Sequence, residues 1–188
     1  MVEIDIIYKL TQGGFSLTKI VSTLSTVIGA QLKRSRKNYD YTIVDCAPGI
    51  SVLTEAFIRL ADFVIVPTIP DPLSTYGLQT FCKSLWRGAQ SPSGPFRKKP
   101  QASVPYVLFT RRRAVNLQTR TAEQLRNHQF SDGPPFRIFK TEVPECVAIA
   151  TALGMAGKFP LYRRKWNGVV HVMESLVQET KEALNGGA

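Results

Sequence analysis

The hydrophobic positions of this chain form two patterns, a helical spacing of three to four residues and short continuous runs typical of buried strands. Between residues 16 and 36, apolar side chains return every three or four positions, which predicts an amphipathic helix. Residues 42–44 form a short β-branched run that ends at Asp45 and is followed by Pro48 and a glycine. A short apolar run bounded by turn-forming residues predicts a buried central strand of a parallel sheet.

The same patterns along the chain predict alternating strands and helices. Further strands are expected over residues 61–67, 104–110 and 136–140, and a shorter one over residues 2–8. Further helices are expected over residues 50–60, 116–127, 146–153 and 168–184, and one that starts at Ser74 or Thr75. This alternation predicts an α/β fold, in which helices cover both faces of a parallel sheet.

Length and composition narrow the class of protein. We expect one domain over residues 1–188, with residues 88–103 as a surface loop because they are rich in glycine, proline, serine and basic residues. No apolar run approaches the roughly 20 residues that span a bilayer. Three widely spaced cysteines and no secretory signal favour a reducing, cytoplasmic setting. A formal net charge of +10 favours attraction to nucleic acid or to an anionic membrane surface.

Several kinds of chemistry are not supported by the sequence. The chain has no Gly-x-Ser-x-Gly motif, no Cys-x-x-Cys pair and no Gly-x-Gly-x-x-Gly turn, and both of its histidines fall in predicted helices. Phosphate and magnesium chemistry remains. Asp45 ends a predicted strand, so it either caps the next helix or holds a magnesium ion that bridges terminal phosphates.

The segment from Tyr39 to Leu78 resembles the ParA/MinD (Soj-like) family of partitioning ATPases. The matching residues are Tyr39-Asp40-Tyr41, Asp45-Cys46-Ala47-Pro48, Ala61-Asp62 with Pro67, Asp71-Pro72-Leu73-Ser74 and Gly77-Leu78. Further on, Phe139-Lys140-Thr141-x-Val143-Pro144 resembles the last strand and base-proximal loop of that family. The resemblance extends over residues 39–185.

The resemblance implies a P-loop-NTPase-like fold that binds ATP and Mg²⁺. It places Asp45 on the metal side, holding Mg²⁺ through water, and Pro48, Val143 and Pro144 beside the nucleotide. It implies a role in plasmid or chromosome partitioning, with a centromere-binding partition protein and a second copy of the chain as partners.

The chain departs from that family at the phosphate loop. The family motif is Lys-Gly-Gly-x-x-Lys-Ser/Thr, and the nearest segment here is residues 12–18, in which Gln12 and Leu17 replace the two lysines. This segment is either a degenerate phosphate loop or a plain turn before a helix. The family's catalytic aspartate has no counterpart either. We therefore interpret the chain as the C-terminal portion of such an ATPase, truncated on its N-terminal side, or as a relative that lost the loop. We expect it to be inactive as a lone chain, and its catalytic residues are not assigned.

Three basic clusters are candidates for contacts with nonspecific DNA. They are Arg97-Lys98-Lys99, Arg111-Arg112-Arg113 and Arg163-Arg164-Lys165. Each cluster could instead be solvated surface charge. A membrane anchor is not expected, because the tail from Glu179 is mildly acidic. Two alternatives stay open: a non-catalytic basic module of the same fold that binds DNA or protein, and an unrelated doubly wound enzyme for a small metabolite.

Overall fold

The computed structural model describes most of the chain. The described residues are 12–14, 16–47, 49, 51–86, 102, 104–127, 135–152, 166 and 168–185. They fall into two compact units, one comprising Met1–Asp62 with Ser84–Ser103 and the other comprising Phe63–Lys83 with Val104–Ala188. The single domain expected from the sequence stays a prediction.

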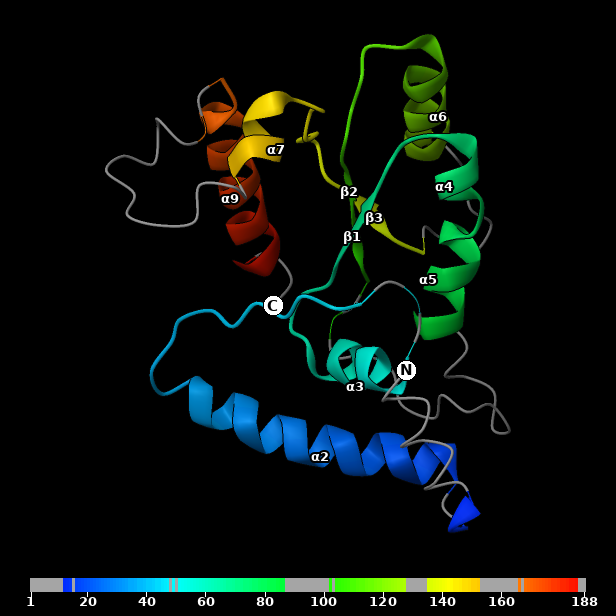
Figure 1. The fold of residues 1–188 in the computed structure, drawn as a ribbon, viewed down its shortest axis with the longest axis vertical. Coiled ribbons are helices and arrows are strands. Elements are labelled where there is room, and N and C mark those ends of the chain that lie inside the picture. Colours follow the sequence, from blue (N-terminus) through cyan, green and yellow to red (C-terminus); the bar gives the residue numbers. More distant parts are fainter. Residues whose placement is uncertain are drawn as a thin grey trace. The chain divides into compact units, whose positions relative to one another are not determined.

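The first unit is built on two helices that pack against each other, α2 (Leu17–Ser35) and α3 (Val52–Leu60) (Figure 1). Each helix begins at a serine whose hydroxyl accepts a backbone N–H one turn on, as N-cap residues do. Ser16 accepts from Lys19 and Ser51 from Thr54. Both helices were predicted from the spacing of apolar residues, and both are confirmed.

The predicted central strand over residues 42–44 is wrong. Residues 41–47 have no strand structure, and the side chain of Ile43 is 93% exposed. Strands of a parallel sheet are buried because they pair within the sheet and because helices cover both of its faces. The described sheet contains three strands, and this segment pairs with none of them. The strand expected over residues 2–8 lies outside the described residues.

The second unit contains a parallel sheet whose strands follow their order in the chain. The strands are β1 (Ile65–Thr68), β2 (Tyr106–Phe109) and β3 (Arg137–Ile138), and the register pairs Val66 with Val107 and Val107 with Ile138. The helices are α4 (Pro72–Tyr76), α5 (Leu78–Trp86), whose residues from Ser84 on are assigned to the first unit, α6 (Asn116–Asn127), α7 (Val147–Ala152) and α9 (Val170–Asn185). In Figure 1, α5 and α6 lie on one side of the strands and α9 lies on the other. The predicted α/β class is confirmed.

Some details of the elements differ from the prediction, since the helix expected to start at Ser74 or Thr75 begins at Pro72. Pro67 was expected to stop its strand but lies inside β1, which tolerates it because β1 is an edge strand of the described sheet. On α6, the Leu117 side chain is 59% exposed. The inward positions include Gln118, whose side-chain oxygen accepts the Arg113 backbone N–H at 2.7 Å. This bond orients the start of α6.

The core of the second unit lies between β2, α5 and α6. Its buried members are Leu78, Cys82, Val107, Phe109, Ala122 and Phe136. Burial raises the pKa of the Cys82 thiol to about 12, so this sulfur stays protonated and packs as an apolar group. Packing of α5 and α6 on β2 therefore fixes the position of the carboxyl end of β2.

We expect Phe109→Ala to destabilise the protein by about 3–5 kcal/mol, because it removes a fully buried ring from the centre of this core. The matched control is Leu73→Ala, since the Leu73 side chain is 88% exposed and its truncation should cost less than about 0.5 kcal/mol. Urea denaturation followed by circular dichroism measures both. Equal destabilisation of the two variants would contradict this assignment of the core.

Candidate functional site at the carboxyl edge of the sheet

The carboxyl ends of β2 and β3 continue into two loops that stay paired through their backbones. We call residues 110–113 and 140–145 together the carboxyl edge. The Arg112 N–H donates to the Val143 carbonyl at 3.0 Å, and the Glu145 N–H donates to the Arg112 carbonyl at 3.0 Å. These bonds extend the parallel pairing beyond the strands. Ligands of α/β proteins bind outside the carboxyl ends of strands, so this is the candidate site of the second unit.

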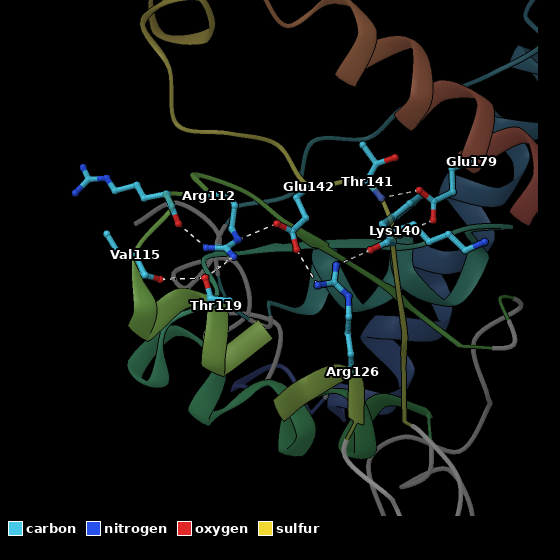
Figure 2. Close-up of polar contacts among 10 residues, drawn as sticks. Arg112, Val115, Thr119, Arg126, Lys140, Thr141, Glu142 and Glu179 are labelled. Carbon is cyan, nitrogen blue, oxygen red and sulfur yellow. Dashed lines mark hydrogen bonds and ion pairs between the residues drawn. The ribbon is translucent and has the colours of Figure 1, made fainter. Parts of the chain in front are cut away.

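Arg112 is a structural residue of the carboxyl edge. Its guanidinium donates to a Glu142 carboxylate oxygen at 2.8 Å, to the Thr119 hydroxyl at 2.9 Å and to the Arg113 carbonyl (Figure 2). Its side chain is largely buried. Three of its five guanidinium N–H groups therefore already have partners within the protein, which leaves at most two for a ligand.

Glu142 also holds a second arginine. Arg126, near the end of α6, donates to the other Glu142 oxygen at 2.8 Å and to the Phe139 carbonyl at 3.3 Å (Figure 2). The Arg126 guanidinium also lies 5.1 Å from the centre of the Phe109 ring, within the range of a cation–π contact. Glu142 thus joins α6 to both loops of the carboxyl edge.

Arg111 and Arg113 differ from Arg112 in being open to solvent. Their side chains are 64% and 61% exposed, and both pair with Glu145, Arg111 at 3.2 Å. The hydrogen bond to Glu145 raises the pKa of the Arg113 guanidinium, and the bonds from Arg113 and then Arg111 lower the pKa of the Glu145 carboxyl. Arg111 has a positive φ of 49°. Two arginines sharing one carboxylate leave a net charge of +1 at this surface.

The loop after β3 is also held by α9. The Glu179 carboxylate accepts the backbone N–H groups of Lys140 at 2.6 Å and Thr141 at 3.0 Å (Figure 2). A carboxylate that accepts two backbone N–H groups makes strong, charge-assisted bonds. No local sequence pattern indicates this contact, because Glu179 lies 39 residues from Lys140.

Val143 and Pro144, predicted to lie beside a nucleotide, are half-buried in this loop. The Val143 N–H donates to the Phe109 carbonyl at 2.8 Å, and its own carbonyl accepts from Arg112. Proline has no backbone N–H. What these two residues can offer a ligand is therefore mainly apolar contact, and their role stays a prediction.

Asp45 lies in the first unit, in the exposed segment that follows α2. Desolvation, and then the charge of Asp45, raise the pKa of the neighbouring Cys46 thiol. Pro48 lies outside the described residues, as do Arg97, Lys98 and Lys99 in the first unit and Arg163, Arg164 and Lys165 in the second.

The described residues fit an ATP–magnesium group only in part. Asp45 offers one carboxylate, and Mg²⁺ is commonly held by one or two carboxylates together with substrate phosphates. Among the described residues, no three histidine, cysteine, aspartate or glutamate side chains converge to hold a metal ion.

Gln12 and Gly13 are exposed, Gly14 has a φ of +81°, and Ser16 caps α2, which is the geometry of a turn before a helix. The lysines that would clamp the phosphates are absent, so the residues do not form a complete ATP–magnesium site.

A pocket of about 610 Å³ lies between the α4–α5 region and α6. Its lining residues are Pro72, Thr75, Tyr76, Gln79, Thr121, Gln124, Leu125 and Asn127. None of them belongs to the carboxyl edge, and none is charged. The pocket therefore offers no charged side chain that would neutralise a phosphate or a metal ion.

Comparison with known proteins relates the chain to nucleotide-binding proteins. Residues 7–91 match the family model described as AAA domain. The chain is 25% identical over 171 residues to the sporulation initiation inhibitor protein Soj of Bacillus subtilis, a match that covers 88% of this chain and 62% of Soj. It is 28% identical over 118 residues to an uncharacterized protein in the gidB 3′ region of Pseudomonas putida, covering 62% of this chain and 41% of that protein.

The chain thus spans less than two thirds of the length of the relatives it matches. No solved structure matches it significantly. Within the part of the chain that the structure describes, no helix is long and apolar enough to cross a membrane.

We expect Arg112→Lys to destabilise the protein by about 2 kcal/mol, because a lysine cannot reproduce the three directed contacts of the guanidinium. Arg111→Lys is the matched control, since an exposed ion pair contributes at most about 1 kcal/mol. Thermal unfolding of both variants measures the difference. Similar melting temperatures for the two variants would count against a structural role for Arg112.

We expect Glu179→Ala to speed hydrogen exchange at the Lys140 and Thr141 amides, because it removes the carboxylate that accepts both N–H groups. Glu182→Ala is the control, since Glu182 lies on the same helix and accepts from Gln178 instead. Amide exchange followed by NMR separates the two. Unchanged exchange at Lys140 and Thr141 in Glu179→Ala would refute the anchoring role.

Proposed function

We propose that the chain is a ParA/MinD-like protein that acts in the partitioning of plasmid or chromosomal DNA in the cytoplasm, a proposal supported by the family-model match over residues 7–91 and by the similarity to Soj. In this role it contacts DNA without sequence preference and works with a centromere-binding partition protein. The main support for the DNA contact is the pair of exposed arginines, Arg111 and Arg113, held on the carboxyl edge.

The arginine pair suits contact with DNA phosphates. A guanidinium presents planar N–H donors that match two oxygens of one phosphate. Arg112 is fixed between the two by Glu142 and Thr119, so the backbone that carries Arg111 and Arg113 is held in place. The net charge of +10 adds long-range attraction to DNA. The basic clusters at residues 97–99 and 163–165 would add further phosphate contacts.

Nucleotide binding is a second part of the proposal. We assign a role on the metal side to Asp45 and a role near the base to Val143 and Pro144, as the family resemblance implies, and we propose that the functional form is a homodimer. When bound, ATP–Mg²⁺ would supply phosphoryl-transfer chemistry. The absence of lysine at positions 12 and 17 removes the charges that clamp phosphates, so we expect weak or absent hydrolysis.

The absence of lysine at positions 12 and 17 also favours a second candidate, a basic module of this fold that binds DNA without any nucleotide role. The two candidates differ in the effect of ATP. A nucleotide-dependent protein would change its DNA affinity when ATP and Mg²⁺ are added, and Asp45→Asn would remove that change. A simple module would respond to neither.

We expect the chain to bind a 30-base-pair duplex of arbitrary sequence with an affinity that falls steeply with salt. Replacing both exposed arginines, Arg111→Gln with Arg113→Gln, should reduce the magnitude of the slope of log K against log[KCl] by about 0.9 for each phosphate that the protein no longer neutralises. Fluorescence anisotropy at several KCl concentrations measures this slope.

The matched control is Lys33→Gln with Lys181→Gln, which removes the same charge from exposed positions on α2 and α9. It should change the slope by clearly less. An equal change in both double variants, or no DNA binding at 50 mM KCl, would refute the assignment of the DNA contact to the carboxyl edge. Robust ATP hydrolysis that Asp45→Asn abolishes would contradict the expectation of an inactive chain.

A further inference from the structure

The carboxyl edge contains two glutamates, and each of them pairs with two arginines. Glu142 holds Arg112 and Arg126, and Glu145 holds Arg111 and Arg113. Four guanidinium groups therefore share two carboxylates. The two sets have the same composition but differ in their surroundings, which suggests different roles.

The Glu142 set is the more enclosed. Glu142 and Arg112 are both largely buried, and Arg126 packs over the Phe109 ring. Removing a carboxylate from such a site leaves a partly buried arginine without its main partner, which is costly. This set belongs to the framework of the protein.

The Glu145 set faces solvent. Arg111 and Arg113 are more than 60% exposed, and the Glu145 side chain is 31% exposed. The backbone of Glu145 is nevertheless fixed, because its N–H donates to the Arg112 carbonyl and it follows Pro144. The carboxylate is thus held close to both guanidinium groups, while each ion pair is weak enough for a competing anion to break.

We propose that Glu145 is an internal counter-ion of the DNA-contacting arginines, which a DNA phosphate must displace from Arg111 and Arg113. This inference rests on the proposed function and adds a regulatory element to the same surface. Glu145 occupies the arginine pair with an anion of the protein's own, so it lowers the affinity for phosphate. It also keeps the pair from binding weak anions when DNA is absent.

The effect of Glu145 follows from the charge of the set. With Glu145 ionised, its charge and those of Arg111 and Arg113 sum to +1, and glutamine at position 145 raises the sum to +2. The phosphate then no longer competes with a neighbouring carboxylate. We expect Glu145→Gln to raise DNA affinity about three- to tenfold at 100 mM KCl and to steepen the salt dependence.

The test compares four versions of the full chain by anisotropy with the 30-base-pair duplex. They are the wild type, Glu145→Gln, Glu174→Gln, and Glu145→Gln combined with Arg111→Gln and Arg113→Gln. Glu174 is exposed on α9, so Glu174→Gln makes the same change in net charge elsewhere. We expect the gain in Glu145→Gln to exceed that in Glu174→Gln and to vanish in the triple variant. Equal gains in both single variants, or a gain that persists in the triple variant, would overturn the inference.

Glu142→Gln separates this role from a structural one. We expect it to lower the melting temperature without raising DNA affinity, whereas Glu145→Gln should leave the melting temperature nearly unchanged. A decrease in stability in Glu145→Gln equal to that in Glu142→Gln would contradict the counter-ion role.

A second titration, with fluorescently labelled ATP and Mg²⁺, identifies the source of the phosphate. If Glu145→Gln raised the affinity for ATP but not the affinity for DNA, the assignment of the phosphate to DNA would be overturned. If the wild type binds DNA through Arg111 and Arg113 but Glu145→Gln has no effect, the inference fails and the proposed function stands. If neither the wild type nor any variant binds DNA at 50 mM KCl, both fail.

Discussion

The parallel pairing of β2 with β3 is the interaction on which the rest of the candidate site depends. It continues beyond the strands through the backbone of Arg112, which bonds to Val143 and Glu145. The continuation places the side chains of two loops, distant in sequence, on one edge. The core formed by α5, α6 and β2 supports this edge, and Glu142 and Glu179 tie it to α6 and α9.

The chemistry of the edge follows from a difference in burial among three consecutive arginines. Arg112 points into contacts with Glu142 and Thr119, while Arg111 and Arg113 remain in solvent and share Glu145. Buried charged groups must be paired to be tolerated, and exposed pairs are weak. One short sequence thus provides both a structural anchor and a surface that an anion can contact. The same distinction separates Glu142, which holds the framework together, from Glu145, which competes with the ligand.

Much of the fold was predictable from the sequence, because it depends on local patterns. The helices at α2, α3 and α6 follow from the spacing of apolar residues, with serine caps at α2 and α3, and the strands at β2 and β3 follow from short apolar runs. Residues 42–44 have the same local pattern but form no strand, since a strand also needs partners that its own residues do not specify. The site was predictable only as a set of basic residues. Its division into anchored and exposed arginines depends on Glu142 and Glu145, which the tertiary fold brings to residues 30 or more positions away.

The central claim is that DNA phosphate contacts Arg111 and Arg113 while Arg112 stays in its internal network. NMR of the arginine Nε–H signals during a titration with duplex DNA tests this claim most directly. We predict that the Arg111 and Arg113 signals shift progressively with DNA and that the Arg112 signal, from a group bonded to Glu142, stays in place. Shifts confined to Arg112, or signals of Arg111 and Arg113 that DNA leaves unchanged while it binds, would contradict the claim.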